Sequence, residues 1–298
     1  MLKGANRKSQ RCEKNPGHPG FIPAPEFSLC HLPVELQSDI VLRYVKNCAA
    51  RTVRLRTIGS SHERPENYPF KEFQGSKVPH WSSGWVCGVY FIGGPCKCHE
   101  CSAEGAKPKD RSWELTVVTA CHGVYNTEEA KQTKVTFFYD DETSGNNIKH
   151  LYGNEVEYAN AREDRCAFGC ITHDEALAVQ MESLRKERVY LWQSILNVAP
   201  FEMQHSQCVI ISHPHGLSKY ITVGQQVEIV SNPGTSQPYY KYLADTCPGS
   251  AGGPVLVLPG LDCPDPGWLP IVLHHSGCAG NGENIYINVS GDRSTLYV

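Results

Sequence analysis

Short apolar runs separated by turn signals fill the chain from about residue 50 onward. Turn-forming glycine, proline and asparagine residues cluster at 93–95, 144–147 and 232–234. Because the strands of β-sandwiches and β-barrels are short and punctuated by such turns, this pattern predicts an all-β architecture. The predicted strands cover residues 52–58, 85–92, 113–119, 134–139, 208–212, 220–230, 254–258, 269–273 and 285–289.

One segment departs from this rhythm. Between residues 174 and 192 the apolar side chains recur near the helical period, and Asp174 stands where an N-cap would lie. The apolar positions are Leu177, Met181, Leu184 and Val189. The pattern predicts a helix that separates two β-rich halves, and the five prolines before residue 35 predict an extended amino-terminal arm.

Three polar motifs punctuate the predicted strands. A hydrophobic strand runs into Thr119-Ala120-Cys121-His122, which delivers an imidazole at the strand's end. Asp164 opens a second short apolar run, and a glycine-rich turn at 249–254 precedes a third. The order of histidine, aspartate and glycine-rich turn is that of the chymotrypsin arrangement.

With these motifs, the region from about residue 50 to the end resembles the trypsin-like (chymotrypsin-fold) serine proteases. The resemblance implies two six-stranded Greek-key β-barrels with a helical insert between them. It also implies that His122 is the general base, that Asp164 orients it, and that the amides of Gly249 and Ala251 form the oxyanion hole. The predicted domains are an arm at 1–35, a first barrel at 36–172, a helical linker at 173–192 and a second barrel at 193–298.

The resemblance also implies a substrate pocket in the second barrel. Asp245 falls where trypsins keep the carboxylate that receives Arg or Lys. The segments 211–216 and 245–249 look more like the glutamyl-endopeptidase and high-temperature-requirement branches. In the glutamyl-endopeptidase branch, a histidine near the place of His274 receives the substrate carboxylate. These two interpretations predict opposite charge preferences. Cys247 and Cys278 fall where many secreted members form the pocket disulfide.

The chain departs from the family at the nucleophile. Aligned on the family's Gly-x-Ser-Gly-Gly-Pro, the sequence 249–254 places Ala251 in the nucleophile's position and Ser250 before it. A methyl group can neither attack a carbonyl nor share a proton with an imidazole. Moving the frame to make Ser250 the nucleophile would put Pro248, which lacks an N–H, where an oxyanion-hole amide is needed. Ser250 nevertheless stays open as the alternative nucleophile.

The amino-acid composition argues against some classes of binding partner. The 28 Lys and Arg residues against 31 Asp and Glu residues give a formal charge of −3, which offers no basic field for nucleic acid or an anionic membrane. No apolar run approaches a transmembrane length, and no secretory signal stands at the amino end. We therefore expect a soluble, intracellular protein, although 14 cysteines leave a secreted one open.

A cysteine-rich segment is a weak zinc candidate. Its residues are Cys96, Cys98, His99 and Cys101, but the spacing is tight and no second ligand pair has the usual partner spacing. The simpler interpretation is a surface loop of free or paired thiols, and neither a metal nor another cofactor is expected.

Three functional hypotheses follow. The leading one is a trypsin-like protease homologue, catalytically inactive at Ala251, that retains a peptide-binding cleft between its barrels. The alternative is an active serine endopeptidase, in which Ala251 is engineered or Ser250 serves as nucleophile. The third is a binding module whose cysteine loop holds zinc.

Overall fold

The computed structural model describes residues 11–143, 145, 147–198, 206–230, 239–258, 271–279 and 286–290. Its helices are α2 (Asp39–Arg51), α3 (Thr127–Lys131) and α4 (Glu175–Val198). Its strands are β1 (Ile22–Pro23), β2 (Thr52–Ile58), β3 (Pro79–Phe91), β4 (Trp113–Ala120), β5 (Thr133–Phe137), β6 (Lys149–Tyr152), β7 (Val156–Asn160), β8 (Arg165–Thr172), β9 (Gln207–Ser212), β10 (Tyr220–Val230), β11 (Tyr239–Tyr242), β12 (Pro254–Leu258), β13 (Ile271–Ala279) and β14 (Tyr286–Ser290).

The first sheet closes into a barrel through one bent strand. Its antiparallel order is β6-β5-β2-β3-β4-β8-β7. Residues 153–155 join β6 to β7 and bond to the strands on either side: Gly153 donates its amide to the carbonyl of Thr133 on β5, and Asn154 donates to that of Gly169 on β8. Taken as one strand, β6 and β7 complete a six-stranded barrel around an apolar core.

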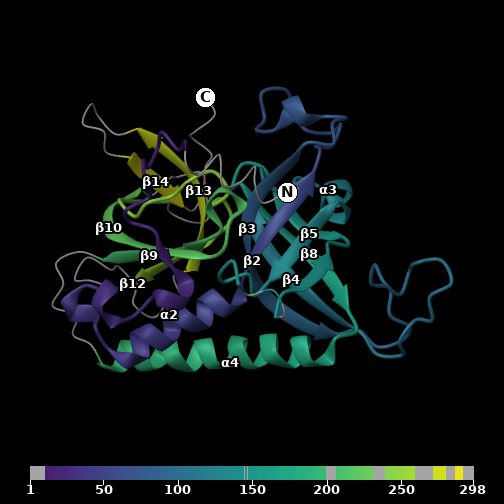
Figure 1. Cartoon of the computed structure of the whole chain (residues 1–298), viewed down its shortest axis with the longest axis horizontal. Coiled ribbons are helices and arrows are strands. Elements are labelled where there is room, and N and C mark those ends of the chain that lie inside the picture. The colour runs from purple at the N-terminus through teal and green to yellow at the C-terminus, as the bar shows by residue number, and fades with distance from the viewer. Residues whose placement is uncertain are drawn as a thin grey trace.

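The second sheet is closed by direct pairing. Its order is β1-β10-β11-β14-β13-β12-β9, and β9 also pairs with β10, so that the six strands from β9 to β14 close and the short β1 is added to β10. The register of that last pair runs from Tyr220 opposite Ser212 to Gln225 opposite Gln207. The predicted architecture of two six-stranded antiparallel β-barrels is therefore confirmed (Figure 1).

The predicted helix is observed as α4, and it runs along both barrels (Figure 1). Asp174 caps it, because its Oδ1 accepts a hydrogen bond from the Leu177 amide at 3.0 Å. Leu177 and Met181 enter the core of the first barrel, whereas Trp192 and Ile195 belong to the apolar cluster between α2 and the strands β9 and β12 of the second barrel. The apolar face thus continues beyond residue 192, which explains why the helix is longer than predicted.

Helix α2 was not predicted. Ser38 caps it by accepting from the Val41 amide at 3.3 Å, and its buried residues recur at helical spacing. That buried face includes Val41, Tyr44, Val45 and Cys48, which belong to the apolar cluster of β9 and β12. Although α2 falls in the range predicted for the first barrel, it packs on the second, and the domain boundaries stay a prediction.

The prolines predicted an extended amino-terminal arm, but the described part of the arm is extended only in places. It forms 3₁₀ turns at 24–26, 29–31 and 34–36, and its strand is β1. β1 pairs with β10, with Ile22 opposite Ile221, so the arm lies along the second barrel. Within the described part of the chain, no helix is long and apolar enough to cross a lipid bilayer.

Candidate active site

A cleft of about 370 Å³ brings together residues of both barrels and of the arm. The first barrel contributes His122, and the glycine-rich turn of the second contributes Ala251. The described residues that line it are Lys14, Phe70, Phe73, Val78, Pro79, His80, Trp81, His122, His215, Thr246, Cys247, Pro248, Gly249, Ala251 and His274.

His122 and Asp164 form a hydrogen-bonded pair at one wall of the cleft. Antiparallel pairing of Ala120 with Arg165 brings the turn after β4 beside the residue that precedes β8. Asp164 Oδ2 lies 2.7 Å from His122 Nδ1, and its Oδ1 accepts from the His122 amide at 2.8 Å. Because the carboxylate accepts a hydrogen bond from Nδ1–H, the proton of the neutral ring stays on Nδ1 and Nε2 is left as the basic nitrogen.

Tyr68 supports this carboxylate from a neighbouring loop. Its hydroxyl lies 3.5 Å from Asp164 Oδ1. Burial and the nearby Asp164 charge raise the pKa of Tyr68 far above its usual value, so the phenol keeps its proton and serves as a donor. The sequence carried no signal for Tyr68, because only the fold of the loop brings it to Asp164.

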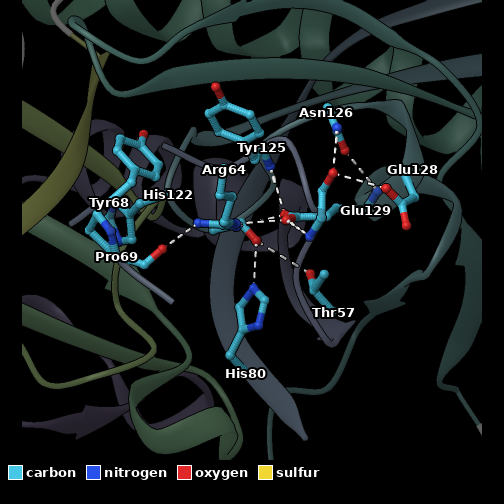
Figure 2. Close-up of polar contacts among 12 residues, drawn as sticks. Thr57, Arg64, Tyr68, Pro69, His80, His122, Tyr125, Asn126, Glu128 and Glu129 are labelled. Atoms are coloured by element: carbon cyan, nitrogen blue, oxygen red, sulfur yellow. Dashed lines mark hydrogen bonds and ion pairs between the residues drawn. The ribbon is translucent and has the colours of Figure 1, made fainter. Parts of the chain in front are cut away.

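A buried ion pair fixes that loop (Figure 2). The Arg64 guanidinium bonds both carboxylate oxygens of Glu129, at 2.7 and 2.6 Å, and donates to the Pro69 carbonyl at 2.6 Å. Such a forked contact is geometrically specific. It holds the chain between Arg64 and Phe70 beside the His122 wall, where the Phe70 ring stacks on His80 with centroids 4.5 Å apart.

The glycine-rich turn packs closely against the first barrel and is hydrogen-bonded to it. Ser83 on β3 donates its amide to the Ala251 carbonyl and its hydroxyl to the Gly249 carbonyl, each at 2.8 Å. Gly249 and Gly252 have φ of +98° and +81°, which side chains with a Cβ rarely adopt. A Cβ on Gly252 would also lie 2.2 Å from Thr119 Oγ1, so this glycine permits the close approach of the two barrels.

Ser250 and Ala251 point in different directions. Ser250 is fully buried, and its hydroxyl accepts hydrogen bonds from Ser212 Oγ at 3.0 Å and from the Cys247 amide at 3.2 Å. Ala251 is half-buried and lines the cleft together with His122. Among the residues of this turn, Gly249 and Ala251 line the cleft, and neither carries a hydroxyl.

His274 and Asp245 differ in their access to the cleft. His274 lines it, and its Nδ1 lies 2.7 Å from the Tyr242 hydroxyl. Asp245 is not among the described lining residues: its carboxylate abuts Gly20 of the arm. Burial raises the pKa of Asp245, and nearby Lys14 and His18 oppose that shift. Asp245 thus faces the arm.

The predicted pocket cysteines are not seen as a pair. Cys247 Sγ lies 3.5 Å from Cys12 Sγ of the arm, a partner the sequence did not suggest. The side chain of Cys278 lies outside the described part of the structure.

The cysteine-rich loop gathers around a different histidine from the one predicted. His99 stacks on Tyr152, with ring centroids 4.3 Å apart. The thiols of Cys96, Cys98 and Cys101 instead surround His173, which follows β8. The sequence did not predict His173 as a partner of these thiols, because it lies 72 residues beyond Cys101.

This chain resembles known proteins only distantly in the comparisons made. No protein-family model matches the chain, and no curated protein matches it. Solved structures of proteases are similar to it over most of its length.

Three of these structures illustrate the likeness. The HtrA-type protease AlgW, solved with a decapeptide, is 12% identical at a TM-score of 0.44, and the match covers 84% of this chain and 63% of AlgW. Deg5 is 14% identical at a TM-score of 0.45, with coverage of 89% and 93%. An inactive form of the Rv3671c protease is 12% identical at a TM-score of 0.43, with coverage of 89% and 92%. The chain thus spans less than two thirds of AlgW, and identities this low do not carry an activity from one protein to another.

Proposed function

We propose that this protein is a trypsin-like protease homologue that binds peptides in its cleft without hydrolysing them. The observation that carries the proposal is that Ala251 lines the same cleft as His122, which is hydrogen-bonded to Asp164. His122 is the proposed general base, but an alanine at the nucleophile's position offers it no hydroxyl to activate. We propose that the side chain at position 251 is needed for hydrolysis of a peptide but not for its binding.

The surroundings of Ser250 support the same proposal. To act as nucleophile, its hydroxyl would have to leave the bonds to Ser212 and to the Cys247 amide. It would also have to emerge from full burial, and a buried amide left without its acceptor costs about 1–3 kcal/mol.

The chemistry of the cleft suits a peptide with an acidic or amide side chain. The described lining includes Lys14 and several histidines, but no carboxylate. With the Tyr242 hydroxyl donating to Nδ1, a neutral His274 carries its proton on Nε2, where it is a hydrogen-bond donor. We therefore propose that the pocket prefers Glu or Gln over Lys or Arg.

Restoring the nucleophile tests the inactivity. We expect the unchanged protein to cleave no unstructured protein substrate and to take up no fluorophosphonate probe. Ala251→Ser is expected to gain both activities, because the base, its orienting carboxylate and the glycine-rich turn are already in place. The double variant Ala251→Ser with His122→Ala is the control and should lose the gain by about 10³-fold or more. Robust turnover by the unchanged protein, sensitive to Ser250→Ala, would refute the proposal.

The charge preference has its own measurement. Fluorescent peptides that differ only in one Glu, Gln, Lys or Arg are titrated against the unchanged protein by anisotropy. We expect tighter binding of the Glu and Gln peptides and a loss of that preference in His274→Ala. Tighter binding of the Lys and Arg peptides would favour the Asp245 interpretation instead.

A further inference from the structure

Four metal-ligand side chains converge away from the cleft. Cys96, Cys98 and Cys101 come from the long loop between β3 and β4, and His173 lies between β8 and α4. Each offers one ligand atom, and the four atoms lie within 4.8 Å of one another. His173 Nδ1 is 3.4 Å from Cys98 Sγ, 3.4 Å from Cys101 Sγ and 3.9 Å from Cys96 Sγ.

These distances are those of a tetrahedral zinc site. Zinc lies about 2.3 Å from a thiolate sulfur and about 2.0–2.1 Å from an imidazole nitrogen. Tetrahedral angles then place sulfur and nitrogen about 3.5–3.6 Å apart, which the three observed distances bracket. All three thiols are buried, and none of them forms a disulfide in the described structure. We infer that Cys96, Cys98, Cys101 and His173 bind a structural zinc ion, which we call the loop site.

Groups around the loop site fit this role. The Cys98 amide donates to Cys96 Sγ at 3.4 Å, the kind of N–H contact that stabilises a thiolate. Glu100 Oε2 lies 3.8 Å from His173 Nε2, within ion-pair distance but beyond hydrogen-bond distance, so a small movement would let this carboxylate accept from the imidazole. Four protein ligands leave no open position, so the ion is structural and ties a loop with no helix or strand to the start of α4.

A second group of four stands beside the cleft and rests on different contacts. Cys12 and His18 belong to the arm, His215 follows β9, and Cys247 precedes the glycine-rich turn. Cys12 Sγ lies 3.5 Å from Cys247 Sγ, and His18 Nε2 lies 3.0 Å from His215 Nε2. Two sulfurs on a tetrahedral zinc are about 3.8 Å apart and two nitrogens about 3.3 Å, so small movements suffice.

The contacts of the arm support this second site. Asn15 donates its side-chain amide to Cys247 Sγ at 3.2 Å and to the Thr246 carbonyl at 2.8 Å. Lys14 Nζ donates to Thr246 Oγ1 at 2.9 Å. We infer a second zinc ion on Cys12, His18, His215 and Cys247, the arm site. It would fasten the arm to the segment that leads into the Ala251 turn and keep Lys14 at the cleft. A Cys12–Cys247 disulfide is the competing arrangement.

Metal analysis of the full-length chain, purified under reducing conditions without chelator, tests both sites independently of the proposed function. We expect two zinc ions per chain by mass spectrometry of the elements. Replacing zinc by Co²⁺ should give the absorption of tetrahedral thiolate-bound cobalt, which needs no variant to be folded. A chain without bound zinc and without this absorption overturns both inferences.

Variants separate the two sites. Cys101→Ser and His173→Asn should each lower the zinc content from two to one, whereas His99→Asn is the matched control and should leave it at two. Zinc content unchanged by both ligand variants overturns the loop site. If they fail to fold, the cobalt spectrum of the unchanged chain still decides. Two filled sites place five thiolates on cobalt, whereas the arm site alone would place two, and the absorption grows with the number of bound thiolates.

For the arm site, Cys12→Ser and His18→Asn should each remove one zinc ion, with Cys30→Ser in the same arm as control. Thiols are counted in the denatured chain with and without reductant. A count that rises by two on reduction in the unchanged chain, but not in Cys12→Ser, identifies the disulfide and overturns the arm site.

Discussion

At the scale of single residues, the Ala251 turn separates conformation from chemistry. Its shape depends on the positive φ of Gly249 and Gly252 and on the hydrogen bonds from Ser83. None of these contacts uses the side chain at position 251. A methyl group there can therefore remove the nucleophile while the turn keeps its shape.

Gly252→Ala tests how tightly this turn is packed. We expect a loss of about 2 kcal/mol or more in the free energy of unfolding, because the new Cβ adds a collision with Thr119 to an unfavourable φ. Gly105→Ala is the control: its φ is also positive, at +77°, but nothing lies within 4 Å of a Cβ there. Urea unfolding compares the two, and equal losses would show that φ alone limits Gly252.

His80 gives the protein a pH-dependent stability. Burial lowers the pKa of His80 to about 4, whereas an unfolded histidine titrates near 6.5. Between those values the unfolded state binds more protons, so stability falls as the pH drops below about 6.5. The contribution of His80 is about 2 kcal/mol between pH 7.5 and pH 5.

Unfolding free energies at these two pH values check this contribution. His80→Gln, whose amide can still donate to the Gly123 carbonyl, should show a weaker pH dependence than the unchanged protein. His213, whose pKa is also lowered by burial, accounts for part of the remainder. Exposed His62→Gln should leave the pH dependence unchanged, and an equally steep decline in His80→Gln would contradict the assignment.

At the scale of elements, the loop that carries Tyr68 depends on a buried charge pair. Arg64 and Glu129 are 0% and 1% exposed, and the Glu129 carboxylate also accepts from the amides of Ser61 and Tyr125. Two buried charges are tolerated here because each is hydrogen-bonded by the other and by the backbone.

Glu129→Gln is expected to lower the free energy of unfolding by about 3–5 kcal/mol, since it leaves the Arg64 charge buried and unpaired. The matched control is Glu175→Gln in the exposed Arg111–Glu175 pair, with an expected loss below about 1 kcal/mol. Denaturant unfolding measures both, and losses of similar size would mean that the buried charge is not the cause.

At the scale of the whole molecule, α4 packs on both barrels. Met181 belongs to the core of the first barrel, and Ile195 to the apolar cluster between α2 and the strands β9 and β12 of the second. A single helix therefore contacts two separate apolar clusters.

Truncating each contact should loosen a different barrel. Met181→Ala is expected to speed hydrogen exchange mainly in β4 and β8, and Ile195→Ala mainly in β9 and β12. Each variant should cost about 2–5 kcal/mol, whereas Val179→Ala on the exposed face should cost less than about 0.5 kcal/mol. The same strands responding to both variants would show that the two cores unfold as one.

Features that depend on neighbouring residues could be read from the amino-acid sequence. Alternation, turn residues and helical spacing specify strands and α4 through contacts within a few residues, and β2 is found at its predicted bounds. The chain order of His122, Asp164 and the glycine-rich turn likewise needed no coordinates.

Which distant groups meet depends on the packing of the folded chain. That packing places His173 beside the three thiols and Cys12 beside Cys247, and it turns the Ser250 hydroxyl toward Ser212 while Ala251 lines the cleft. The direction of a side chain on a tight turn, and the partner of a thiol far along the chain, depend on how two closed barrels pack together. No periodicity in the sequence reports that packing, because it arises from contacts between segments far apart along the chain.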